Sequence, residues 1–192
     1  SHVFEHIYEP DQFMQHLAGY MSKGQNLIFS LPNMHEMLKR KYTNCINFEH
    51  TVFLTEAYIE FLLAKYGFRL VEKQYFREDH SIFFSTVRDE SVQPTALPGS
   101  LYEENKKLYI DFIQYHEELI ADLNQKMENM DRPVYLFGAH VFAQYLIACG
   151  LKTEKIVSIL DNDPNKQSKR LYGTGLIVQS PKILRDIDRP CV

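Results

Sequence analysis

Two acid–imidazole pairs, Glu5-His6 and Glu49-His50, are the residues whose chemistry stands out in this sequence. An imidazole can take up a proton near neutral pH, and a neighbouring carboxylate can fix its tautomer, so either pair could supply a general base. The alternative for each histidine is a structural role in which a ring nitrogen bonds a backbone carbonyl. The other histidines show no metal-ligand spacing such as HExxH, and the sequence therefore predicts no metal site.

A second candidate site lies where the apolar stretch 134–137 meets Gly138-Ala139-His140. A strand, a glycine turn and the start of a helix place backbone N–H groups where an anion can bind. Asp161 closes the next strand, at the position where dinucleotide-binding folds carry a ribose-binding acid, and Asn162 follows it. Only one glycine of a GxGxxG motif is present, so the alternative is a βαβ unit that binds nothing.

The elements that must position these residues predict an α/β protein with two domains. Residues 1–88 are expected to contain helices that begin at Pro10 and after the cap residue Thr55, and apolar strands at 25–30, 68–76 and 80–87. The short gap before residue 80 predicts that the last two strands pair as an antiparallel hairpin, which ends a partial Rossmann-like sheet. Ligand crevices of such sheets lie at the carboxyl ends of the strands, which favours a functional position for His6.

The second half of the chain predicts a linker, a long helix and a βαβ unit. Residues 89–100 gather proline, glycine and small polar residues without a period, which is typical of a domain boundary. Residues 101–192 are expected to hold a long helix and an incomplete second Rossmann-like domain. The apolar stripe of the helix favours packing on its own domain, with a homo-oligomer contact as the alternative. That stripe comprises Leu108, Phe112, Tyr115, Leu119, Leu123 and Met127.

Composition excludes several classes of function. The formal net charge of -4 gives no basic field for a nucleic-acid backbone. The three cysteines form no CxxC or Cys/His pattern, which argues against a disulfide framework and favours a cytoplasmic setting. The apolar runs are far shorter than the ~20 residues that a bilayer requires, so no membrane segment is expected.

The order of several motifs resembles the C-terminal half of a class I S-adenosylmethionine-dependent methyltransferase. The matching strings are His2-Val3-Phe4-Glu5-His6-Ile7, Lys23-Gly24-Gln25-Asn26-Leu27-Ile28-Phe29-Ser30-Leu31-Pro32-Asn33, Phe48-Glu49-His50 and Lys65-Tyr66-Gly67-Phe68. The stretches Leu136-Phe137-Gly138-Ala139 and Ile159-Leu160-Asp161-Asn162-Asp163-Pro164 are similar to the Rossmann-like C-terminal domain of sugar C-methyltransferases, which methylate a carbon of a nucleotide-linked keto-sugar.

This resemblance implies roles for the residues named above. His50, with Glu49, aligns with the general base that forms an enolate, and His6 is expected near the methyl-transfer site. Glu5 and His6 would contact S-adenosylmethionine, whereas Gly138, Ala139, His140, Asp161 and Asn162 would contact the nucleotide. The family's tyrosine before the histidine is Asn47 here, and Glu78-Asp79-His80-Ser81 replaces a glycine-rich segment. O- or N-methylation therefore stays open beside C-methylation.

The family's cofactor-holding glycine turn would precede Ser1. The sequence therefore predicts a methyltransferase fragment that is inactive alone, because methyl transfer requires the donor and the nucleophile to be held in line. The alternative is a non-catalytic module that binds a nucleotide or nucleotide-sugar.

Overall fold

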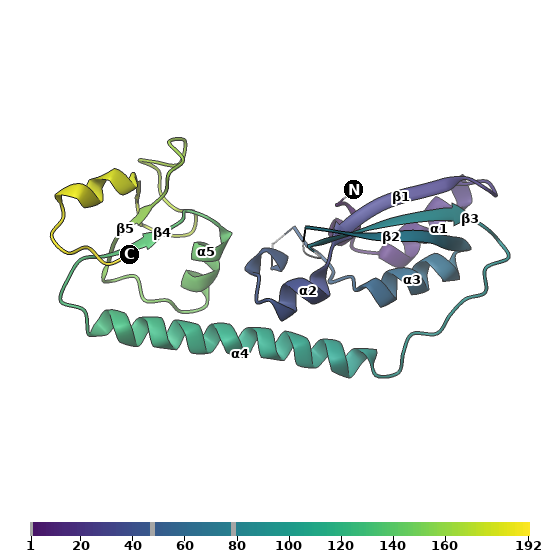
Figure 1. The fold of residues 1–192 in the computed structure, drawn as a ribbon, viewed down its shortest axis with the longest axis horizontal. Coiled ribbons are helices and arrows are strands. Elements are labelled where there is room, and N and C mark those ends of the chain that lie inside the picture. Colours follow the sequence, from purple (N-terminus) through teal and green to yellow (C-terminus); the bar gives the residue numbers. More distant parts are fainter. Residues whose placement is uncertain (1, 47–48, 78–79) are drawn as a thin grey trace. The chain divides into compact units, whose positions relative to one another are not determined.

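The computed structural model describes residues 2–46, 49–77 and 80–192, and it divides into two compact units, Ser1–Phe112 and Ile113–Val192 (Figure 1). The division falls inside the long helix α4 (Leu101–Glu128), downstream of the stretch 89–100 that composition suggests as a linker. The physical reason is that the first part of α4 packs on the first unit, where the rings of Phe53 and Tyr109 lie 6.0 Å apart.

The first unit is built on a three-stranded sheet with the order β1-β3-β2. Strands β2 (Phe68–Phe76) and β3 (Ser81–Arg88) pair antiparallel, which confirms the predicted hairpin. Strand β1 (Asn26–Pro32) also pairs antiparallel with β3, so β1 and β2 run in the same direction. The reversed strand lies in the middle of this sheet, whereas the sequence suggested that it would close the sheet as an edge.

Helices and short turns surround this sheet. They are η1 (Phe4–His6), α1 (Pro10–Tyr20), α2 (Met34–Lys39), η2 (Thr43–Cys45) and α3 (Glu56–Lys65). Helices α1 and α3 contribute to the same hydrophobic core. Asp11 joins them directly, since its carboxylate accepts hydrogen bonds from Lys65 Nζ at 2.6 Å and Tyr66 Oη at 2.8 Å.

The core of the first unit follows from the alternation of its strands. Phe29 and Leu31 lie on one face of β1, opposite Phe84 and Ile82 of β3, and all four side chains are buried. The Phe29 and Phe84 rings stack with centroids 5.1 Å apart. Side chains separated by two residues share a face of a strand, so this pattern buries one side of the sheet under the helices.

The second unit contains a parallel sheet with the order β4-β5-β6, which confirms the predicted βαβ connection. Its elements are β4 (Val134–Phe137), α5 (Val141–Ala148), β5 (Ile156–Leu160), β6 (Val178–Gln179) and η3 (Pro181–Asp186). The chain end adds an isolated bridge to β4, because Tyr135 N–H donates to the carbonyl of Cys191 at 2.8 Å.

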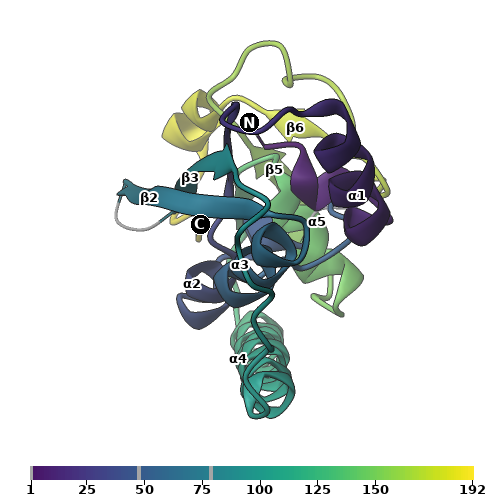
Figure 2. The ribbon, with the colours of Figure 1, turned by 90° about the vertical axis from the view of Figure 1, so that its right-hand side faces the viewer.

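Helix α4 is continuous over 28 residues and is seen along its axis in Figure 2. Phe112 and Met127 of the predicted apolar stripe are buried, whereas Tyr115 is 47% exposed. The ring of His116, which the stripe omitted, is buried and lies edge-on to Tyr145 with centroids 5.0 Å apart. Among the described residues, no helix combines the length and apolar character that crossing a bilayer requires.

Candidate functional site

The structure brings Glu5, His6 and His50 together from two distant segments of the first unit. One possible ligand atom of each side chain lies within 4.8 Å of the others, and the two imidazole rings have centroids 5.2 Å apart. Backbone bonds hold the segments in place, since the carbonyl of Glu5 accepts a hydrogen bond from Thr51 N–H at 2.9 Å. We call these three residues the Glu5–His6–His50 cluster.

Both imidazoles of this cluster are oriented by backbone carbonyls. The Nδ1 atom of His6 lies 2.7 Å from the carbonyl oxygen of Glu49, and the Nδ1 atom of His50 lies 3.0 Å from that of Cys45. A carbonyl oxygen only accepts hydrogen bonds, so Nδ1 carries the proton in each ring. In the neutral rings, Nε2 therefore holds a lone pair that can accept a proton or bind a metal ion.

Glu5 is the buried member of the cluster, with only 1% of its surface exposed. Its Oε1 atom lies 3.3 Å from His2 Nδ1 and 3.9 Å from His6 Nε2. The other oxygen, Oε2, has no hydrogen-bond partner among the described residues. A buried carboxylate oxygen without a donor carries a desolvation cost.

Glu49 and Cys45 contribute to the cluster through their backbones. The side chain of Glu49 is exposed, whereas its carbonyl orients His6. The Cys45 thiol is buried and donates to the Tyr42 carbonyl at 2.9 Å, and burial raises its pKa to about 11. The thiol therefore stays protonated near neutral pH and is a poor nucleophile.

In the second unit, Asp161, the acidic residue of the predicted nucleotide site, is hydrogen-bonded to backbone groups of its own domain. The Asp161 carboxylate accepts hydrogen bonds from the backbone N–H groups of Ala139 at 2.8 Å and Asp163 at 2.9 Å, and it pairs with Lys166 at 3.1 Å. The hydrogen bond from Asp163 is the main cause that lowers the pKa of Asp161, and burial opposes it. This carboxylate stabilises the β4–α5 turn.

The remaining residues of the predicted nucleotide site lie in the β4–α5 turn or shortly after β5. Gly138 adopts a φ of 102°, a left-handed conformation that strains other residues, which explains the glycine. His140 is the N-cap residue of α5 and is exposed, and its side chain makes no capping hydrogen bond. Asn162 is also exposed. A contact between these residues and a nucleotide stays a prediction.

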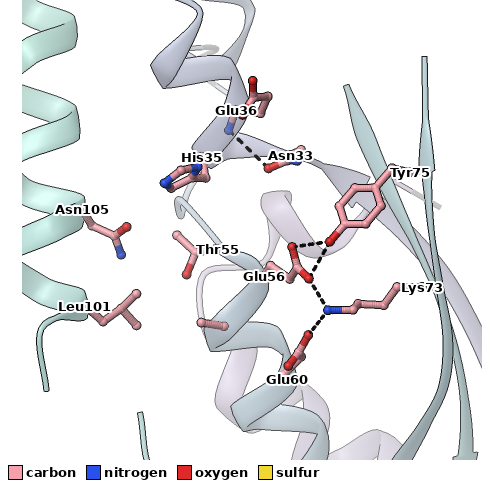
Figure 3. Close-up of a pocket in the computed structure, with 11 residues that line it drawn as sticks. Asn33, His35, Glu36, Thr55, Glu56, Glu60, Lys73, Tyr75, Leu101 and Asn105 are labelled. Atoms are coloured by element: carbon pink, nitrogen blue, oxygen red, sulfur yellow. Dashed lines mark hydrogen bonds and ion pairs between the residues drawn. The ribbon is translucent and has the colours of Figure 1, made fainter. Parts of the chain in front are cut away.

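A cavity of about 590 Å³ in the first unit holds charged residues that the sequence analysis missed (Figure 3). Lys73 pairs with both Glu56 and Glu60, and Tyr75 Oη donates to Glu56 at 2.8 Å. Burial alone would lower the pKa of Lys73, but the hydrogen bonds to the two carboxylates outweigh it and raise the pKa. The signal was present, because Glu56 and Glu60 share a helix face and Lys73 and Tyr75 share a strand face.

Comparisons with known proteins add no assignment. Neither the protein-family models nor the curated proteins compared with this chain gave a match. Asn47, Phe48, Glu78 and Asp79, which belong to the motifs and departures of the resemblance, lie outside the described residues.

Proposed function

We propose that this chain is part of an S-adenosylmethionine-dependent methyltransferase that acts on a carbon beside the ketone of a nucleotide-linked sugar. The observation that carries the proposal is the pairing of His6 and His50, whose rings lie 5.2 Å apart and whose Nδ1 atoms are both directed to backbone carbonyls. The strand directions are compatible with it, since β1 and β2 run the same way on either side of the reversed β3.

His50 has the tautomer that a general base needs. With the proton on Nδ1, the Nε2 lone pair is available to remove a proton from the substrate carbon. In the imidazolium that results, Nδ1–H still donates to the Cys45 carbonyl, which helps to stabilise the positive charge. The nearby carboxylate of Glu5 stabilises the same charge, because it is buried in a region of low dielectric.

His6 supplies a second imidazole beside this base. Its side chain is 34% exposed, so it can contact a substrate while Glu49 holds its orientation through the backbone. In this proposal His6 positions the acceptor carbon or its oxygen, and Glu49 orients His6 through its backbone carbonyl. O- or N-methylation would use the same His50 lone pair on a hydroxyl or an amine.

The described residues fit the acceptor side of the reaction better than the donor side. S-adenosylmethionine would supply the methyl group when bound. Glu5 is almost fully buried, so its carboxylate presents no open surface to a group of that size, and His6 alone of the two predicted contacts could touch it. The proposal therefore assigns most donor contacts to sequence outside these 192 residues.

The test is methyl transfer by a protein in which this chain is joined to a complete S-adenosylmethionine-binding region. It is supplied with isotopically labelled S-adenosylmethionine and a panel of nucleotide-linked keto-sugars, and the products are analysed by mass. The variant H50N retains an amide donor for the Cys45 carbonyl but lacks Nε2, so we expect it to abolish transfer and also deuterium exchange at the substrate carbon. The control H16N alters an exposed histidine of α1.

Full activity of H50N would remove His50 from the mechanism. Absence of methyl transfer by the unaltered protein across the sugar panel would contradict the proposed substrate class. If hydroxyl- or amine-bearing substrates were methylated instead, the enolate step would be wrong while the role of the His50 lone pair would stand.

A further inference from the structure

We propose that the Glu5–His6–His50 cluster is a binding site for a divalent transition-metal ion such as Zn²⁺. The three side chains offer two imidazole nitrogens and one carboxylate oxygen, and these ligand atoms lie within 4.8 Å of one another. Two histidines and one carboxylate are a ligand set found in catalytic zinc sites and in non-haem iron sites. The site shares His6 and His50 with the proposed methyltransferase site, but metal binding does not require methyl transfer.

The backbone already arranges the two histidines as metal ligands. Histidines that bind metal through one ring nitrogen usually donate the other N–H to a carbonyl or a carboxylate, which fixes the tautomer and the ring orientation. His6 and His50 each have this arrangement, through the carbonyls of Glu49 and Cys45. Each Nε2 is therefore deprotonated in the neutral ring, as metal binding requires.

The carboxylate gives the second, independent indication. Glu5 has 2% side-chain exposure, and its Oε2 atom has no hydrogen-bond partner among the described residues. His2 can donate to Oε1, but its distance of 3.3 Å leaves the other oxygen uncompensated. The cluster thus brings one ring nitrogen of each histidine and a buried carboxylate oxygen within 4.8 Å of one another. A divalent cation bound beside this carboxylate would offset the cost of burying it.

The distances between the ligand atoms fit a bound Zn²⁺ ion after small side-chain movements. Zn²⁺ bonds of about 2.0–2.2 Å place tetrahedral ligand atoms ~3.3 Å apart. The Glu5 Oε1 and His6 Nε2 atoms are 3.9 Å apart in the structure. Side-chain rotations that draw the ligands together by up to ~1.5 Å would complete the site, and the 34% exposure of His6 gives its ring room to move. Three protein ligands leave one position open to water or a substrate oxygen.

Metal binding and base catalysis compete for the same atom. The Nε2 lone pair of His50 can hold a metal ion or accept a proton, but not both. Zinc is therefore expected to inhibit the methyl transfer proposed above. Because metal binding is measured without substrate, failure of the metal site and failure of the methyltransferase proposal are distinguishable.

The direct test is calorimetric titration of this chain with ZnCl₂, together with the visible absorption of bound Co²⁺. We expect one metal ion per chain with micromolar or tighter affinity and a Co²⁺ spectrum of low coordination number. The variants H6N and H50N keep the donor for the backbone carbonyl and lose Nε2, so each should weaken binding by at least roughly 10–100-fold. The control H16N should bind as the unaltered chain does.

A second variant separates a metal role for Glu5 from a structural one. In E5Q, the amide can donate a hydrogen bond to a neighbouring Nε2 atom. We therefore expect the metal-free variant to be at least as heat-stable as the unaltered chain, while stabilisation by ZnCl₂ is lost.

The proposal is overturned if the chain binds no Zn²⁺ at micromolar concentration, or if H6N and H50N bind it as H16N does. If circular dichroism showed that H50N is misfolded, H6N would decide, because the His6 side chain is 34% exposed and its replacement is therefore better tolerated by the fold.

Discussion

Replacing Asp161 by alanine should loosen the β4–α5 turn while leaving the first unit intact. The change removes the acceptor of two backbone N–H groups, those of Ala139 and Asp163, and one contact with Lys166. A hydrogen bond to a charged acceptor contributes about 1.5–3 kcal/mol when it is shielded from water. Since the side chain is only 13% exposed, we take the low end for each backbone bond and neglect the surface pair with Lys166. The expected loss is about 3 kcal/mol.

Hydrogen exchange measured by NMR locates this loss. The Ala139 amide should exchange roughly 10-fold faster in D161A than in the unaltered chain, because the single hydrogen bond that it loses contributes about 1.5 kcal/mol. Amides of β3 in the first unit should keep their rates and serve as the internal control. The variant D161N retains an oxygen acceptor without the charge, and its Ala139 rate should lie between the two.

The contribution of Asp161 to folding stability should depend on pH in the direction set by its lowered pKa. Hydrogen bonds lower the pKa of Asp161 in the folded state, so its charge stabilises the fold above the unfolded-state pKa of about 4. That contribution is lost as the pH falls through the lowered value. The stability difference between the unaltered chain and D161N should therefore be largest at neutral pH and shrink in acid. An unchanged Ala139 exchange rate in D161A, or a difference that grows in acid, would refute the structural role of Asp161.

Three further results are expected. This chain alone should show no calorimetric binding of S-adenosylmethionine at micromolar concentration, and a saturable micromolar isotherm would contradict the assignment of donor contacts to outside sequence. The variant F84A should lower the free energy of unfolding by about 3–5 kcal/mol in urea titrations, because Phe84 is fully buried, whereas I28A at a position 69% exposed should cost less than about 1 kcal/mol. Iodoacetamide at pH 8 should label the exposed Cys149 well before the buried Cys45, because a pKa of about 11 keeps the Cys45 thiol protonated. Equal labelling rates by mass spectrometry would contradict the burial of Cys45.

The regular elements were largely predictable because their signals are local. Alternating apolar residues and the short connection between β2 and β3 predicted the hairpin, and the Gly138 turn predicted the parallel connection in the second unit. Helix α2 was missed, although Asn33 caps it by accepting from Glu36 N–H at 3.3 Å. An N-cap residue three positions before a glutamate is a recognised helix start, so the signal existed in the sequence.

The arrangement of the candidate site was less accessible, because it depends on contacts between distant segments. Motif spacing identified His6 and His50 separately, but it gave no reason to place their rings within 5.2 Å. That approach follows from the bonds between Thr51 and Glu5, which hold the chain at Thr51 against η1. Ligand spacing along the chain therefore predicts no metal site, whereas the fold brings ligand atoms of Glu5, His6 and His50 within 4.8 Å of one another.

Asp161 and Glu5 both follow apolar stretches of the sequence, but their hydrogen bonds give them different roles. Asp161 is matched by donors of its own chain, so its charge contributes to the stability of a turn and little remains for a ligand. Glu5 is more deeply buried and keeps one oxygen without a described donor, beside two imidazoles whose free nitrogens are also acceptors. Burial of unmatched acceptors costs free energy that a bound proton or cation can offset. This difference makes the Glu5–His6–His50 cluster, and not the β4–α5 turn, the place where ligand binding should be tested first.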